Sequence, residues 1–243
     1  MSDKMIAMRS LFSRLHWRLG ALLLLGAVGC GLLSSDITKV TFDLPAKMYS
    51  FDTAQWGIPA GNTVAVPCGG ANPIQDCCNP PAPLPKPNCT ANPVVCEASL
   101  CTLEQPVTVS QTMNLKAEVP ELSSVNSQSL VDISLSNLHY DAKSTLNVDV
   151  PPLELFLAPD MVTDPKDAQA MKFGTVPAIA KGTSPSGDVV LEPGADALFA
   201  GYGHAFSTPF NFIASTTVSV PSGSPTPTGT ITVTVTGKVA AKL

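Results

Sequence analysis

Residues 210–220 read FNFIASTTVSV, and residues 231–243 read ITVTVTGKVAAKL. In both stretches apolar residues fall mostly on alternate positions, and Ser, Thr or Lys occupies many of the positions between them. A period of two gives a strand one buried and one solvated face. The intervening residues 221–230 are rich in Pro, Gly and Ser, which is typical of turns. We therefore expect a long antiparallel hairpin, whose apolar face needs a second layer to cover it.

Shorter alternating stretches lie upstream, at residues 40–44, 63–66, 107–119, 130–135, 138–140, 146–150 and 153–157. Pro45 is expected to end the first of them, because proline lacks the N–H that a strand ladder needs. Helices are expected only at about 165–172, after the capping candidate Asp164, and at 195–204. The chain is therefore predicted to be all-β, as an antiparallel β-sandwich or open barrel with one or two short helices.

An insert at about residues 67–106 has a different composition from the rest of the chain. It holds nine prolines and no aromatic residue, so it buries too little apolar surface to offset the entropy of ordering it. It also holds six of the seven cysteines, namely Cys68, Cys77, Cys78, Cys89, Cys96 and Cys101. An even number of cysteines in an exported chain predicts disulfides, here three whose pairing the sequence leaves open. A thiolate metal site is the alternative, disfavoured because no C-x2-C pair and no nearby His accompany the cysteines.

The N-terminal region has the composition of an export sequence. Lys4 and three arginines precede an apolar run at residues 19–29. At about 1.5 Å per residue this run is too short to cross a hydrocarbon core of roughly 30 Å, which favours a signal peptide.

The apolar run ends in Ala27-Val28-Gly29-Cys30, which resembles the lipobox of bacterial lipoproteins. The resemblance covers residues 1–30 and departs from the commonest pattern in having Ala27 where Leu usually stands. It implies a signal peptide at 1–29, lipidation of Cys30 on sulfur with palmitate-type chains and a lipidated tether at 30–36. The alternating stretches that follow predict a single β domain at 37–243, interrupted by the insert at about 67–106. By the same resemblance, Gly31 in place of Asp after the cysteine implies the outer membrane of the cell envelope. An uncleaved signal anchor, or conventional cleavage and secretion, is the alternative.

Charge restricts the partners of the mature chain. After residue 29 the chain keeps ten lysines and 18 acidic residues and has no arginine, so its net charge is near −8. Phosphate neutralisation needs cationic side chains, and phosphate recognition usually recruits arginine, so we expect no nucleic-acid partner. The expected partner is the membrane, reached through the lipid anchor, with lipid or another envelope protein as further possibilities.

No residues form a recognisable catalytic set. The mature chain has only His139 and His204, and it lacks the Gly-x-Ser-x-Gly nucleophile motif. Asp160, Asp164 and Asp167 do not have the spacing of a calcium loop. We expect no cofactor, no metal and no catalytic residue.

One aromatic group could be either a ligand pocket or a well-packed core. Its members lie within 14 residues: Phe199, Tyr202, Phe206, Phe210 and Phe212. The function expected from the sequence is that of a non-catalytic envelope lipoprotein with a structural or binding role. The alternatives are a periplasmic or outer-membrane carrier of lipid or another hydrophobic ligand, which would use this aromatic group, and an envelope hydrolase.

Overall fold

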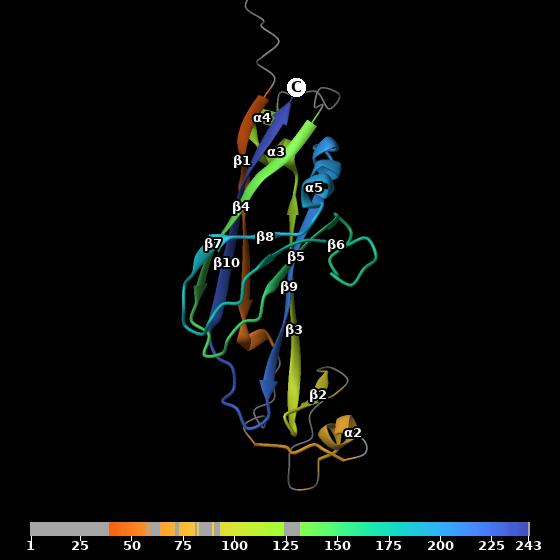
Figure 1. Cartoon of the computed structure of the whole chain (residues 1–243), viewed down its shortest axis with the longest axis vertical. Helices are drawn as coiled ribbons and strands as arrows, with labels where there is room; N and C mark the ends of the chain where they lie inside the picture. The colour runs from red at the N-terminus through yellow and green to blue at the C-terminus, as the bar shows by residue number, and fades with distance from the viewer. Residues whose placement is uncertain are drawn as a thin grey trace, which may run out of the picture. The chain divides into compact units, whose positions relative to one another are not determined.

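The computed structural model describes residues 39–56, 58, 64–70, 73–80, 82, 89, 93–123 and 132–242 (Figure 1). The strands are β1 (Lys39–Asp52), β2 (Val94–Glu97), β3 (Leu100–Met113), β4 (Asp132–Ser144), β5 (Leu153–Pro159), β6 (Met171–Val176), β7 (Ser186–Asp188), β8 (Val190–Leu191), β9 (Phe210–Pro221) and β10 (Thr230–Lys242). The helices are η1 (Thr53–Gln55), α2 (Pro73–Cys78), α3 (Leu115–Glu118), α4 (Pro120–Ser123) and α5 (Ala195–His204).

The strands form two antiparallel sheets, which confirms the all-β prediction. The smaller sheet has the order β1-β10-β4-β7, and the larger has the order β2-β3-β9-β5-β6-β8 (Figure 1). Inward-facing residues from both sheets make one large hydrophobic core. The architecture is an open sandwich, because each sheet keeps two edge strands.

The hairpin predicted for residues 210–243 was wrong. β9 pairs with β3 and β5 in the larger sheet, whereas β10 pairs with β4 and lies between β4 and β1 in the smaller one. β10 alternates as expected, and β9 does so from Ala214 onward, and these inward-facing residues belong to the core shared by the two sheets. Residues 210–214 of β9 are all buried, because Ile213 packs on the other face of the sheet in a small cluster with Ala158 and Val162. The linker between Pro221 and Thr230 is long enough to cross from one sheet to the other, a separation of roughly 10 Å. Alternation shows which residues face the core but does not identify the neighbouring strand.

Pro45 does not end the first strand, contrary to expectation. β1 continues to Asp52, and it lies at an edge of its sheet, where a missing N–H is tolerated. The buried residues change parity along the strand, from Phe42 and Leu44 to Tyr49 and Phe51. The strand is therefore irregular near Pro45, which conceals its second half from a search for strict alternation.

Similar irregularity joins two predicted stretches into β4. The register between β4 and β10 shifts at Lys238 and Val239, so Ser136 has no partner residue. Buried positions consequently change from Ile133 and Leu135 to Leu138 and Tyr140. A β-bulge thus explains why one strand looked like two.

Two other predicted strands are not strands. Residues 64–66 are described but form no strand, and Thr63 lies outside the described residues. Residues 146–149 form no strand, because the backbone N–H and the side chain of Asn147 are hydrogen-bonded to residues 226 and 228. Val150 makes an isolated β-bridge with Ile179.

Helical structure also differs from expectation. The stretch 107–119 is a strand only to Met113, and Leu115–Glu118 is a helical turn whose N-cap Asn114 accepts the N–H of Ala117. The helix expected at 165–172 is absent, because the side chains of Asp164 and Asp167 accept backbone N–H groups two residues ahead and form turns.

The second predicted helix is confirmed as α5, Ala195–His204. It buries Ala195, Phe199 and Gly203, which are spaced by four. A Cβ atom at Gly203 would lie 2.9 Å from two carbons of Ile133 on β4. Glycine at this position therefore allows the helix to approach the sheet closely.

Candidate functional site

Cys30, the proposed lipidation site, and the tether at residues 30–36 lie outside the described residues. Among the residues that the structure describes, no helix combines the length and apolarity needed to cross a membrane.

All six cysteines of the proline-rich insert form disulfides, which confirms the prediction of three bridges. The pairs are Cys68–Cys96, Cys77–Cys101 and Cys78–Cys89. The sequence could not choose this connectivity, because it depends on where α2 and the β2–β3 hairpin meet.

The insert is joined to the larger sheet at one end. Cys101 belongs to β3, and its disulfide ties α2 to that strand. The N–H of Cys101 donates to the carbonyl of Val66, and the hydroxyl of Ser222 accepts the N–H of Val66. β3 begins at Leu100, so the insert expected at about residues 67–106 shares its last residues with a strand of the larger sheet.

Two of the disulfides lie against each other. The Sγ atoms of Cys68, Cys77 and Cys101 are all within 4.8 Å of one another, and all three residues are buried. Such a group resembles a thiolate metal site in spacing, but each sulfur here is bonded to another sulfur. A disulfide sulfur is not a thiolate, so this oxidised group offers no ligand set for zinc.

Four members of the aromatic group pack ring against ring, whereas the ring centroid of Phe206 lies 5.9 Å from Nζ of Lys116. Phe199, Phe206, Phe210 and Phe212 are buried, and Tyr202 is half-buried. Phe210 lies at the centre, with ring centroids 5.0 Å from Tyr202, 5.6 Å from Phe212 and 6.4 Å from Phe199. A cavity lined in part by Phe212 is only about the size of one water molecule. The rings therefore fill the space that a ligand would need, as a hydrophobic core does.

Phe173 of β6 completes this core and was not anticipated. Its ring lies 6.3 Å from Phe199 and 5.9 Å from Phe212. It is fully buried, although it lies outside the dense aromatic segment of the sequence. Only the pairing of β6 with β5 brings it there.

His139 has a carboxylate neighbour but no nucleophile in the described chain. Its Nδ1 lies 3.2 Å from Oδ1 of Asp188, in a pair that links β4 to β7 at the surface. No hydrogen bond joins its ring to a described Ser, Thr or Cys side chain, and His204 is exposed at the end of α5. The exposed pair is consistent with a surface contact. A catalytic triad would also need a nucleophile hydrogen-bonded to the other ring nitrogen of His139.

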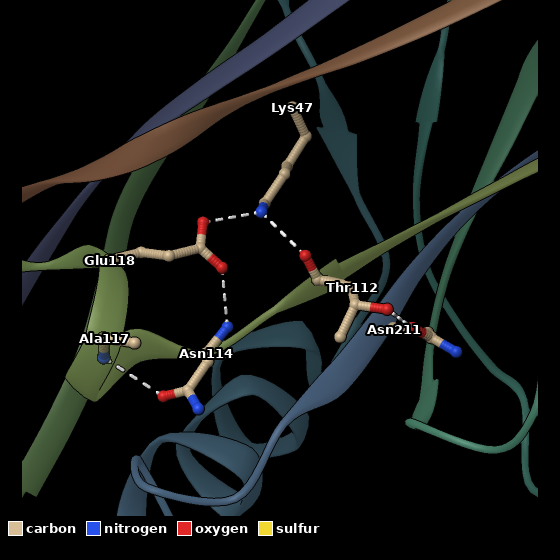
Figure 2. A network of polar contacts seen from close by, with 6 residues as sticks. All are labelled: Lys47, Thr112, Asn114, Ala117, Glu118 and Asn211. Atoms are coloured by element: carbon tan, nitrogen blue, oxygen red, sulfur yellow. Dashed lines mark hydrogen bonds and ion pairs between the residues drawn. The ribbon is translucent and has the colours of Figure 1, made fainter.

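Figure 2 shows a polar network that sequence reasoning missed. Nζ of Lys47 on β1 donates to the carbonyl of Thr112 on β3 at 2.8 Å and lies 2.7 Å from Oε2 of Glu118. The other oxygen of Glu118 accepts the N–H of Asn114. Lys47 therefore connects the edge strand of one sheet to the other sheet, where α3 begins.

The network continues through Asn211 to the β5–β6 loop. The hydroxyl of Thr112 donates to Oδ1 of Asn211, and the amide of Asn211 donates to the carbonyls of Asp160 and Val162. Asn211 is almost fully buried, and these bonds satisfy its side chain. Thr112 and Asn211 are cross-strand partners, so the contact follows from a strand register that the sequence did not reveal.

A groove that sequence analysis also missed lies over β5, β6 and β9. Its lining includes the ring of Phe156, the hydroxyl residues Ser215 and Thr217, and Lys172. Hydrogen bonds from Lys172 to Glu154 and to Glu192 raise the pKa of its amine above the ordinary value. Hydroxyl groups and balanced charges suit a polar ligand better than an acyl chain.

No protein-family model matches this chain, and no curated protein sequence matches it. Among solved structures, it is similar to a decameric BFDV capsid protein, with 12% identity over 84% of this chain and 99% of that chain and a TM-score of 0.33. Desmodium yellow mottle tymovirus gives 11% identity over 67% and 94% of the two chains, at a TM-score of 0.23. The empty head of turnip yellow mosaic virus gives 17% identity over 68% of this chain and 85% of that chain, at a TM-score of 0.22.

Proposed function

We propose that this protein is a lipid-anchored component of the bacterial cell envelope, with the outer membrane as its location. Its β-sandwich body has a binding or structural role and does not catalyse a reaction. The proposal joins the resemblance of Ala27-Val28-Gly29-Cys30 to a lipobox with the chemistry of the remaining cysteines.

One observation carries the proposal. The chain has seven cysteines, and six of them pair among themselves. This leaves Cys30 with no cysteine of its own chain to bridge. Three disulfides favour an oxidising compartment outside the cytoplasm, and the one remaining cysteine lies at the end of the apolar N-terminal run.

The described surface supports binding more than catalysis. The His139–Asp188 pair is exposed and lacks a bonded nucleophile among the described residues. The groove containing Phe156 and Thr217 instead offers hydroxyl groups and an apolar ring on the outward side of the larger sheet. Labelling of the folded protein by a serine-directed fluorophosphonate, abolished in His139→Ala, would contradict the non-catalytic assignment.

Metabolic labelling tests the anchor. The full chain is produced in a Gram-negative host fed an alkynyl palmitate analogue, and the label is detected on the protein after coupling to a dye. We expect labelling of the wild-type chain and none of Cys30→Ala. The variant is also expected to keep residues 1–29, because cleavage of lipoprotein precursors requires the modified cysteine.

Ser34→Ala is the matched control, since it changes the proposed tether and leaves the lipobox intact. It should label as strongly as the wild type. Equal labelling of the wild type and Cys30→Ala, or no labelling of either, would overturn the anchor and with it the proposed location.

A further inference from the structure

We propose that Cys68, Cys77, Cys96 and Cys101 form a thiol–disulfide exchange site. An external thiol opens Cys68–Cys96 at the sulfur of Cys96, and the Cys68 thiolate released then attacks the Cys77–Cys101 bond. The substrate class is a small dithiol or the thiol pair of a partner protein. The inference goes beyond the proposed function and does not depend on the lipid anchor.

The positions of the sulfurs support the internal step. Sγ of Cys68 lies within 4.8 Å of both sulfurs of the Cys77–Cys101 disulfide. Thiolate attack on a disulfide sulfur requires this kind of proximity, and no segment of backbone has to move far to achieve it. Cys96 does not belong to this close group, so the Cys68 thiolate released from it attacks the Cys77–Cys101 bond.

Burial sets the order of the two steps. Cys68, Cys77 and Cys101 are 6%, 0% and 5% exposed, so an external thiol cannot reach them directly. Cys96 is only half-buried, on the short strand β2 at the edge of the larger sheet. Access at Cys96 followed by internal transfer carries the exchange from the surface to a buried bond.

The β2–β3 hairpin holds Cys96 beside the buried disulfide. Cys96 is the direct cross-strand partner of Cys101. The two turn residues between the strands, Ala98 and Ser99, have φ angles of 48° and 65°. Two left-handed residues in succession are typical of a tight type I′ turn, which fixes the register of the hairpin.

The chemistry balances in two exchanges. The external thiolate bonds to Sγ of Cys96, the Cys68–Cys96 bond breaks, and Cys68 leaves with the electron pair as a thiolate. Cys68 then bonds to Cys77 or Cys101, and the other sulfur of that pair becomes the new thiolate. No net electrons move in this second exchange. A second thiol of the external dithiol resolves the mixed disulfide at Cys96, so that the dithiol is oxidised and one protein disulfide is reduced.

Cys96→Ser gives the most direct test, because it leaves Cys68 as the starting free thiol. The full chain is purified from an oxidising compartment, quenched in acid, labelled with N-ethylmaleimide, and mapped by mass spectrometry after peptic digestion without reduction. We expect the label on Cys68, Cys77 and Cys101, each carrying roughly a third of it, since exchange between similar disulfides is nearly balanced. Labelling of Cys68 alone, with Cys77–Cys101 intact, would overturn the proposal.

Cys89→Ser is the matched control. It frees Cys78, which forms no comparable close group with other described cysteines. The label should therefore remain on Cys78 alone. Scrambling in this variant to the same extent as in Cys96→Ser would show general exchange without a defined site, and would also overturn the proposal.

Limited reduction of the wild-type chain keeps the test valid if Cys96→Ser does not fold. Species with one disulfide reduced are trapped by acid and alkylation. We expect molecules in which Cys96 is alkylated together with Cys77 or Cys101, and in which Cys68 has a new partner. Recovery of only the Cys68 and Cys96 thiol pair would refute the internal transfer.

Discussion

Phe210→Ala separates the two interpretations of the aromatic group, core and ligand pocket. The ring is fully buried and contacts the rings of Tyr202, Phe199 and Phe212. Removing a buried Phe ring costs roughly 3–5 kcal/mol when the surrounding side chains cannot collapse into the space. In a body of about 200 residues this corresponds to a fall in Tm of roughly 6–20 °C.

Urea denaturation followed by circular dichroism, with the disulfides intact, measures the free energy of unfolding. Thr217→Ala is the matched control, because Thr217 is exposed on the same strand and its loss should change stability by less than about 0.5 kcal/mol. A loss below about 1 kcal/mol for Phe210→Ala would refute the packed-core interpretation, because a residue lining an empty pocket leaves no new cavity.

Three further changes test other parts of the structure. Gly201→Ala should stabilise the protein by about 0.5–1 kcal/mol, since nothing lies near the added methyl group. Gly203→Ala should destabilise it by about 1–3 kcal/mol, because the added methyl group would overpack against Ile133. If chemical denaturation gave changes in stability of the same sign for both variants, the placement of α5 against the sheet would be wrong. A double-mutant cycle of Lys47→Met and Glu118→Gln should give a coupling energy of about 1 kcal/mol, because the ion pair is partly shielded from water. If the losses in free energy of unfolding of the two single variants simply added up in the double variant, the two side chains would not interact. Burial raises the pKa of the Tyr49 hydroxyl in the folded protein above its ordinary value. As the pH rises, Tyr49 therefore loses its proton in the unfolded state before it does so in the folded state. The free energy of unfolding should therefore be unaffected by Tyr49 below pH about 10 and fall above it by up to about 1.4 kcal/mol per pH unit, and a Tyr49→Phe variant with the same alkaline slope would disprove this.

The β class could be predicted from the sequence because alternation reports directly on burial. Alternation predicts that Phe210, Phe212, Ile231 and Val233 lie on the buried faces of their strands, and all four are buried. Alternation contains no information on strand pairing, so the strands containing these residues were placed in one hairpin when they lie in different sheets. Pairing is a long-range property and needs the whole set of strands.

Local polar chemistry explains the helix errors. The side chain of Asp164 accepts a backbone N–H, as a helix cap would, but the same hydrogen bond also forms in a turn. Asn114 was not singled out, although it caps a turn of helix after β3. Capping residues mark a change in backbone direction more reliably than they mark the element that follows.

The candidate sites were predictable in composition but not in geometry. Six cysteines in a proline-rich segment predicted three disulfides, and the structure confirms that number. The proximity of Cys68 to the Cys77–Cys101 bond depends on the packing of α2 against the β2–β3 hairpin. The contact of Lys47 with Glu118 joins residues 71 positions apart, and no local pattern in the sequence indicates it.

The N-terminal peptide of the native protein tests the central claim most directly. The protein is extracted from cell envelopes in detergent, digested, and its first peptide is identified by tandem mass spectrometry. We expect a chain that begins at Cys30, with a diacylglyceryl group in thioether linkage and the six other cysteines disulfide-bonded. A first peptide that still contains residues 19–29, or an unmodified thiol at Cys30, would contradict it.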